Sequence, residues 1–218
     1  MQLPTPSHRE WEAASITVSM SVLKPLRLDP AGYRRTPWKN GGGVTVDIAD
    51  SYLPGAAVGS WDGMVWRFGR TRIEQPGPFS DLSGFDRHLM VIEGNGLMLH
   101  PAEAPSLDVR RPFHPVSFDG GWRITSELTQ GPVAVLNLLA DRRLAETLLE
   151  VHTAPAAMKL PESTGIIYAP LAATVALDGE DYSLAADAAI RIDGDLPMTV
   201  EVKAGSVAIA CIRLRELP

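Results

Sequence analysis

The 218-residue chain contains little cysteine and no apolar segment long enough to span a membrane. Its single cysteine, Cys211, excludes an intramolecular disulfide, and its apolar neighbours in 207–212 are typical of a small buried side chain rather than a reactive thiol. A transmembrane helix needs roughly 20 apolar residues, and no run approaches that length. Glu10 and Glu12 precede any hydrophobic stretch, which argues against a secretory signal peptide. We therefore expect a cytoplasmic protein without a membrane partner.

Positive charge is also scarce. The 20 lysines and arginines are outnumbered by 26 acidic residues, which gives a formal net charge of −6 and a pI near 5.4. The densest basic clusters are pairs of arginines, as in 34–35, 110–111 and 142–143. A nucleic-acid-binding surface needs a basic patch or stripe, so we expect no nucleic-acid partner.

The sequence lacks the patterns of a metal or nucleophile site. Three or four ligands must converge on a transition metal, and no two of the five histidines lie within two residues of each other. His88 and His100 flank a hairpin signal at 93–96 and could approach each other, although separate faces are the simpler interpretation. No Gly-x-Ser-x-Gly elbow occurs. We predict no bound metal and no cofactor.

Short apolar runs separated by glycine and proline predict an all-β fold. The 19 glycines and 18 prolines are scattered at short intervals, and 44–48 alternates apolar and polar residues as a half-buried strand does. Turn residues at 93–96, 178–181 and 193–195 indicate hairpins. One short helix is predicted over Asp141–Glu150, because Asp141 can serve as an N-cap and Leu144 and Leu148 share a helical face.

These segments predict two β units packed as one. Residues 1–19 are polar and aperiodic, and we expect them to form a poorly packed N-terminal extension. Residues 20–150 form the longer, N-terminal unit and 151–218 the shorter, C-terminal one. Open strand edges often pair between copies, so a homodimer is a possible assembly.

The most informative segment is 36–44, in which Trp38, Lys39 and Asn40 precede three consecutive glycines. Glycines let a backbone turn sharply and expose N–H groups to an anion, to which Lys39 adds a cation and Asn40 an amide. The alternative is a tight glycine turn in which Trp38 is only a core anchor. No Gly-Lys-Ser/Thr follows, so the segment is not a phosphate loop.

Polar residues inside apolar strands provide the other candidates. Arg67 and Trp66 lie in the apolar strand 64–73, where burial of the guanidinium requires an anionic ligand or an internal Asp or Glu. Arg87 follows Asp86 at the start of another strand, which favours a structural ion pair. Asn137 is the only amide in 133–140, and a buried amide needs partners.

Several of these segments together resemble one family. The motifs are Pro-Trp-Lys-Asn-Gly-Gly-Gly at 37–43, Val-Thr-Val-Asp-Ile-Ala at 44–49, Trp-Arg at 66–67, Gly-Pro-Phe-Ser at 77–80, Gly-Phe-Asp-Arg at 84–87, Glu-Gly-Asn-Gly at 93–96 and Asn-Leu-Leu-Ala-Asp-Arg-Arg at 137–143. In this order they resemble the HutD/Ves family. Val135-Leu136 replaces the family's usual Asp-Phe, and Phe68-Gly69-Arg70 replaces its usual Ala/Ser-Ile continuation.

The resemblance implies a fold and a role. Members are similar to cupins, with two β-barrel units fused as a single-chain bicupin. The HutD branch accompanies histidine-degradation operons, where it is thought to bind a pathway metabolite and restrain flux rather than to catalyse a step.

We therefore predict a metal-free binding protein for a small carboxylate metabolite, formylglutamate-like or urocanate-like, with a regulatory role in histidine utilisation. The alternative is a cofactor-independent isomerase or hydrolase that uses Glu127 or Asp86 with an arginine. The missing metal and nucleophile motifs favour the binding protein, and no residue is assigned as catalytic. The predicted ligand-binding residues are Trp38, Lys39, Asn40, Trp66, Arg67, Arg87 and Asn137.

Overall fold

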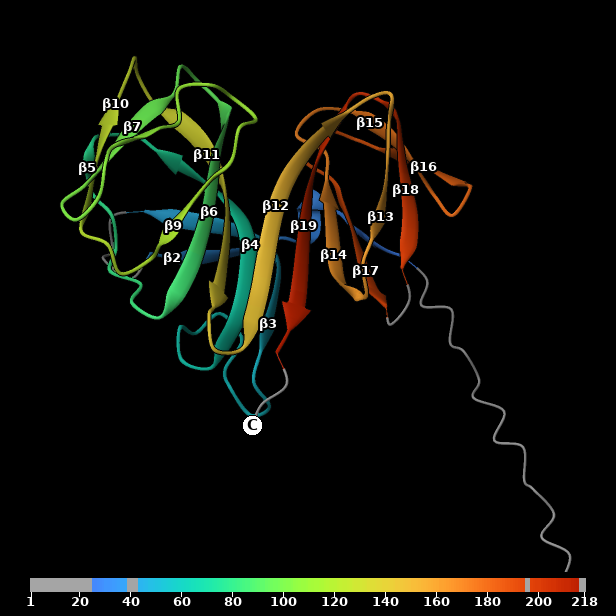
Figure 1. Cartoon of the computed structure of the whole chain (residues 1–218), viewed down its shortest axis with the longest axis horizontal. Helices are drawn as coiled ribbons and strands as arrows, with labels where there is room; N and C mark the ends of the chain where they lie inside the picture. Colours follow the sequence, from blue (N-terminus) through green and yellow to red (C-terminus); the bar gives the residue numbers. More distant parts are fainter. Residues whose placement is uncertain (1–24, 39–42, 195–196, 216–218) are drawn as a thin grey trace, which may run out of the picture.

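Nearly all regular structure in the described part of the chain is β-strand. The computed structural model describes residues 25–38, 43–194 and 197–215, in which nineteen strands and one short 3-10 turn at Pro30–Gly32 occur. The all-β prediction is therefore confirmed. The expected N-terminal extension 1–19 lies outside the described residues. Figure 1 shows two β units side by side, with strands of both units meeting in the middle of the molecule.

The N-terminal unit consists of two sheets. The larger has the order β2-β3-β4-β11-β6-β9, with neighbouring strands antiparallel. Its strands are β2 (Arg34–Pro37), β3 (Val44–Tyr52), β4 (Met64–Ile73), β6 (Phe85–Glu93), β9 (Val116–Asp119) and β11 (Val133–Asp141). The smaller sheet has the order β5-β10-β7-β8. Its strands are β5 (Gly77–Pro78), β7 (Leu97–Pro101), β8 (Leu107–Asp108) and β10 (Ile124–Leu128).

The C-terminal unit repeats this two-sheet plan. Its larger sheet has the order β1-β17-β14-β19-β12. The strands are β1 (Leu26–Leu28), β12 (Ala145–Thr153), β14 (Ser163–Tyr168), β17 (Ala189–Gly194) and β19 (Ser206–Leu214). The second sheet has the order β13-β18-β15-β16. Its strands are β13 (Ala156–Leu160), β15 (Ala173–Leu177), β16 (Glu180–Leu184) and β18 (Met198–Ala204).

Side-chain alternation on β4 divides the molecule into layers. Successive residues of a strand point to opposite faces of its sheet. Trp66 and Phe68 point to one face and pack in a buried cluster with Leu136, Tyr168 and Ile212, which joins the larger sheets of both units. The opposite face of β4 points into the N-terminal unit. The two units therefore share one apolar layer and leave the interior of the N-terminal unit available for other side chains.

The interior of the C-terminal unit is filled with apolar side chains. Its two sheets enclose a buried cluster that includes Ile167, Val175, Ile190, Val200 and Ile209.

The helix predicted over 141–150 is wrong, because β11 ends at Asp141 and β12 begins at Ala145. A tight turn joins them, in which the Asp141 carboxylate accepts a hydrogen bond from the Arg143 N–H at 2.9 Å. Aspartate closes such turns by the same chemistry with which it caps helices. In β12 the neighbours Leu148 and Leu149 are 49% and 3% exposed, as alternation in a strand requires.

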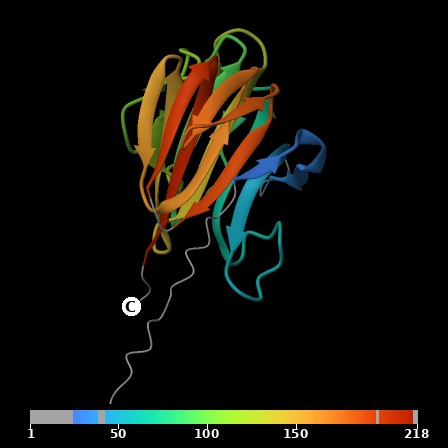
Figure 2. The same cartoon turned by 90° about the vertical axis from the view of Figure 1, so that its right-hand side faces the viewer.

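The first described strand belongs to the second unit. β1 pairs with β17, so that Leu26 lies opposite Arg191. In Figure 2 this strand, in blue, lies beside the orange and red strands of the C-terminal unit. β12 follows β11 directly and pairs with β19. The described chain thus starts with a strand of the C-terminal sheet, continues through the strands of the N-terminal unit, and comes back to the C-terminal sheet at β12.

A polar cluster also joins the units. The Arg70 guanidinium on β4 donates two hydrogen bonds, both 2.7 Å long, to the carboxylate of Asp187. Tyr168 donates to the same carboxylate at 2.8 Å, and Tyr33 donates to the Asp187 carbonyl at 2.7 Å. Burial, together with the negative charge of Asp187, raises the pKa of both tyrosine hydroxyls. Both tyrosines therefore stay protonated and act as donors.

Candidate functional site

A cavity of about 750 Å³ lies inside the N-terminal unit. One wall is the inner face of β4, β11 and β6, and strand register fixes the side chains on it. Leu139 on β11 pairs with Arg67 on one side and with Arg87 on the other. One step along, Asn137 pairs with Gly69 and Leu89. These side chains share one face, and the buried polar groups among the lining residues are Arg67, Thr71, Arg87, Ser126 and Asn137.

Arg87 is a buried cation without a carboxylate partner among the described residues. It is 9% exposed, and its guanidinium lies between the rings of Phe79 and Phe118, at 4.9 and 5.1 Å from their centroids. One long hydrogen bond of 3.4 Å runs from its Nη2 to the Asn137 Oδ1, and its Nε has no partner. Burial lowers the pKa of Arg87 to about 10, which leaves it charged near neutral pH.

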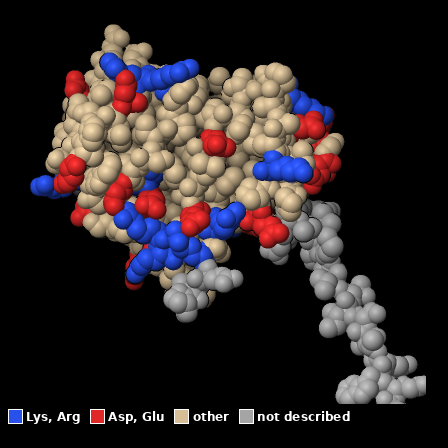
Figure 3. All heavy atoms as spheres, viewed as in Figure 1, with Lys and Arg blue, Asp and Glu red and all other residues tan. Residues whose placement is uncertain are grey.

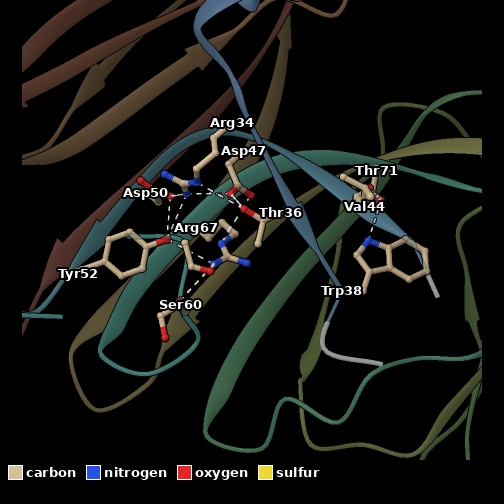
Figure 4. Close-up of polar contacts among 11 residues, drawn as sticks. Arg34, Thr36, Trp38, Val44, Asp47, Asp50, Tyr52, Ser60, Arg67 and Thr71 are labelled. Atoms are coloured by element: carbon tan, nitrogen blue, oxygen red, sulfur yellow. Dashed lines mark hydrogen bonds and ion pairs between the residues drawn. The ribbon is translucent and has the colours of Figure 1, made fainter. Parts of the chain in front are cut away.

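Arg67 is held by protein groups instead. It is 2% exposed, and its Nε lies 3.6 Å from the Asp47 Oδ1. Its Nη2 donates long hydrogen bonds to Tyr52 Oη and to the carbonyls of Gly59 and Ser60, at 3.3 to 3.4 Å. The Trp61 ring covers its guanidinium at 4.6 Å. Figure 4 shows Asp47, Tyr52 and Ser60 around Arg67.

Arg34 is a second arginine that forms ion pairs with the aspartates near Arg67. Its Nη2 lies 2.8 Å from the Asp47 Oδ2 and also contacts Asp50. Thr36 donates a hydrogen bond to the same Asp47 oxygen. Two guanidinium groups, of Arg34 and Arg67, therefore face two carboxylates, of Asp47 and Asp50. The interpretation in which Arg67 meets an internal aspartate fits this geometry.

Trp38 lies at the other end of the wall. Its Nε1 donates to Thr71 Oγ1 at 3.1 Å, and the Thr71 hydroxyl donates to the Val44 carbonyl at 2.7 Å (Figure 4). A Cβ added to Gly43 would lie 2.9 Å from the indole, so this glycine permits the close approach of the chain to Trp38. Trp38 lines the cavity, whereas Lys39 and Asn40 lie outside the described residues.

Trp66 does not line the cavity. It is 1% exposed and packs in the layer between the units, where the Arg191 guanidinium lies 5.2 Å from its ring centroid. Alternation explains the difference, since Arg67 points inward and its strand neighbour Trp66 must then point outward. The structure thus brings Trp38, Arg67, Arg87 and Asn137 to one cavity and separates Trp66 from them.

The expected ion pair of Asp86 with Arg87 is not present. Asp86 lies 3.2 Å from Arg142 Nη2, because neighbours on a strand point to opposite faces. Glu127, the other candidate acid, lies 3.1 Å from His100 Nε2 at the surface. Neither Asp86 nor Glu127 lines the cavity.

The described residues contain no group of three or more His, Cys, Asp or Glu side chains arranged to hold a metal ion. His88 and His100 have separate hydrogen-bond partners. His88 is buried between Ser117 and Thr147, at 2.7 and 3.0 Å, and burial lowers its pKa. His100 contacts Ser106 at 2.8 Å. No described helix has the length and apolar character needed to cross a membrane.

Charges of both signs are interspersed on the face seen in Figure 3. Many charged side chains of the described residues form ion pairs, such as Arg142 with Asp119 at 2.8 Å and Arg123 with Glu103 at 2.6 Å. Of the two buried arginines among the described residues, Arg67 lies near a carboxylate and Arg87 does not.

Sequence reasoning missed Trp61, Phe79 and the aspartate that holds Arg67. Phe79 lies in the Gly-Pro-Phe-Ser motif at 77–80, where the motif itself was a signal. Asp47, 4% exposed, takes a polar position in the alternation of 44–48, so the sequence pattern gave no sign of its burial. Trp61 lies in an irregular segment, and nothing in the sequence indicated that its ring would cover an arginine.

Comparisons with known proteins agree with this architecture. A family model described as HutD matches residues 30–210. The chain is 35% identical over 120 residues to an uncharacterised 21.2 kDa protein in the hutC 3′ region of Pseudomonas putida. That match covers 55% of this chain, which spans about three fifths (59%) of the relative's length.

Two solved structures share most of the fold. HutD from Pseudomonas fluorescens SBW25 has a TM-score of 0.74, and a conserved protein of unknown function from Pseudomonas aeruginosa PAO1 has 0.75. Each is 23% identical, and each alignment covers 88% of this chain and 100% of the other. At this identity the likeness concerns the fold, which is all-β and cupin-like as predicted.

Proposed function

The chain belongs to the HutD family, and on that premise we propose that it binds a small carboxylate metabolite and has a regulatory role in histidine utilisation. Family membership and the relative in the hutC 3′ region support a role related to histidine utilisation. The ligand and the regulatory action are the further content of the proposal.

Arg87 carries the proposal. A buried guanidinium without an anion costs stability, and proteins retain such groups where a ligand supplies the missing charge. Arg87 presents a planar fork of N–H donors, which matches the two oxygens of a carboxylate. Asn137, which contacts Arg87, adds an amide donor from the neighbouring strand.

The cavity also has the size and walls of a metabolite site. Its volume of about 750 Å³ falls within the usual range for small-molecule pockets. Trp38, Trp61 and Phe79 supply aromatic walls beside the polar groups. A formylglutamate-like or urocanate-like acid would place its carboxylate at Arg87 and its body against these rings.

A binding role is favoured over the cofactor-independent isomerase or hydrolase. The two acids considered for proton transfer, Asp86 and Glu127, do not line the cavity, so neither is within reach of a ligand bound there. The one carboxylate among the described lining residues is Glu74, which is exposed and paired with Arg72 at 2.8 Å. Incubation of the bound acid with the protein, followed by NMR, would expose any turnover.

The test is isothermal titration of urocanate and N-formylglutamate into the wild-type protein and into Arg87→Met. Methionine keeps much of the length of the side chain and removes its charge and donors. We expect at least one acid to bind the wild type, and the variant to lose about 10- to 100-fold in affinity, the usual worth of a hydrogen bond to a charged group.

Arg123→Met is the matched control, because this exposed arginine of the same unit lies outside the cavity. It should bind as the wild type does. If Arg87→Met binds with unchanged affinity, Arg87 is not the anchor. If no carboxylate binds the wild type, the proposed function fails.

A further inference from the structure

The buried polar groups of the cavity have unused donors but few unused acceptors. The Arg87 guanidinium makes one long hydrogen bond, to Asn137 Oδ1 at 3.4 Å. This bond uses one lone pair of that oxygen, and the Asn137 amide N–H groups have no described partner. Arg67 can only donate as well. The inner wall of the cavity therefore suits a ligand group that accepts hydrogen bonds.

The two buried hydroxyls of the wall are already engaged. Thr71 donates to the Val44 carbonyl and accepts from Trp38. Ser126 donates to the Gly77 carbonyl at 3.1 Å and accepts from the Gly77 N–H at 3.2 Å. Each hydroxyl has donated its only hydrogen and keeps one free lone pair, a neutral acceptor that cannot balance the charge of a cation.

No carboxylate among the described residues lines the buried part of the cavity. Glu74 lines its outer part, is exposed and pairs with Arg72. Asp47 is a buried acid of the Arg67 network but not a lining residue. Arg34 and Thr36 contact its Oδ2, and its Oδ1 lies 3.6 Å from Arg67 Nε without a hydrogen bond. A cation on a bound ligand would therefore find guanidinium groups and no counter-charge.

From this arrangement we infer that the site selects carboxylates that carry no ammonium group on the adjacent carbon. It would take deaminated or N-acylated acids and reject free α-amino acids. An amino acid whose carboxylate reaches Arg87 would bury its ammonium group beside the same guanidinium. Burial of an unpaired charge and repulsion between like charges both oppose that pose. The inference rests on the proposed carboxylate site and specifies its ligand class.

The experiment compares the two ligands of each of three pairs, in which one member carries an ammonium group and the other does not. 3-(Imidazol-4-yl)propionate has the skeleton of L-histidine without its amine, and 3-phenylpropionate stands in the same relation to L-phenylalanine. N-Formylglutamate and L-glutamate form a third pair, in which acylation removes the charge. Each is titrated into the wild-type protein at about pH 8, where an ordinary imidazole is neutral.

We expect the acid without the ammonium group to bind at least about tenfold more tightly in every pair for which binding is measured. Arg87→Met should weaken binding of the acid without the ammonium group. The affinities for the two members of each pair should then differ by no more than about threefold. Arg123→Met should preserve the wild-type ratio. The wild-type ratio alone decides the selectivity, even if Arg87→Met does not fold.

The outcomes separate this inference from the proposed function. If an amino acid binds as tightly as its deaminated or acylated partner, the selectivity is overturned and the carboxylate site stands. Full selectivity in Arg87→Met would overturn the assignment of the repulsion to Arg87. If no acid binds, including urocanate and N-formylglutamate, both the proposed function and the inference fail.

Discussion

Substitution of Arg87 by methionine should stabilise the ligand-free protein while it abolishes tight ligand binding. The guanidinium is 9% exposed and has no acidic partner among the described residues, so the folded state bears the cost of its desolvation. Burial makes the pKa of this group fall to about 10. At about 1.4 kcal/mol per pKa unit, that fall corresponds to about 3 kcal/mol.

Two favourable contacts reduce this gain. The stacking of the guanidinium between Phe79 and Phe118 is worth about 1 kcal/mol, and the long hydrogen bond to Asn137 about 0.5 kcal/mol. The methionine side chain restores much of the packing on both rings. The net expectation for Arg87→Met is a gain of about 1–2 kcal/mol in the free energy of unfolding.

Urea unfolding of the ligand-free proteins, followed by tryptophan fluorescence, measures this difference. A chain of this size should show a rise in Tm of about 2–4 °C per kcal/mol. Arg123→Met provides the reference and should stay within about 0.5 kcal/mol of the wild type. If Arg87→Met is less stable than the wild type by about 1 kcal/mol or more, the guanidinium is a structural group, and the reasoning that makes it a ligand anchor is refuted.

Three other substitutions test the surrounding architecture. Burial lowers the pKa of His88, so the unfolded chain takes up more protons as the pH falls below about 6.5, and stability should decrease there. Melting curves at several pH values should show a smaller acid-induced loss for His88→Gln, and an equal loss would contradict this. Asp187→Asn weakens the contact with Arg70 but tolerates the positive φ of that residue, and urea unfolding should show a loss of about 1–2 kcal/mol. A wild-type midpoint would show that the contact adds nothing. Gly69→Ala would place a Cβ 2.7 Å from the Val46 carbonyl, and we expect a loss of at least about 1 kcal/mol in the same assay. An unchanged stability would mean that β3 can shift away.

Period-two patterns and turn residues were sufficient to predict the β architecture. Short alternating runs such as 44–48 have few structural alternatives, and the hairpin signals at 93–96 and 178–181 fall where one strand ends and the next begins. The segment 141–150 was misread because an aspartate followed by two leucines four residues apart suits a helix as well as a turn and a strand. Thr147, Val151 and Thr153, which are β-branched, were the signals that favoured the strand.

The site was harder to derive than the fold. Burial of arginines in apolar strands could be predicted from their neighbours, but the partner of each depends on contacts between distant segments. Asp47 meets Arg67 because a neighbouring strand carries it there, and Arg87 has no acidic partner because its sequence neighbour Asp86 points the other way. Local sequence therefore suggested the reverse assignment, with Arg87 as the structural residue and Arg67 as the ligand anchor.

The pairing of β1 with β17 has a consequence for synthesis of the protein. During translation β1 (Leu26–Leu28) is the first of the described strands to leave the ribosome. Its partner strand β17 emerges only after the whole pocket-bearing unit has been made. The edge of the C-terminal sheet therefore closes late, through a contact between segments very distant in sequence, and such contacts slow folding. β1 therefore stays without its partner strand until synthesis of the described chain is almost complete.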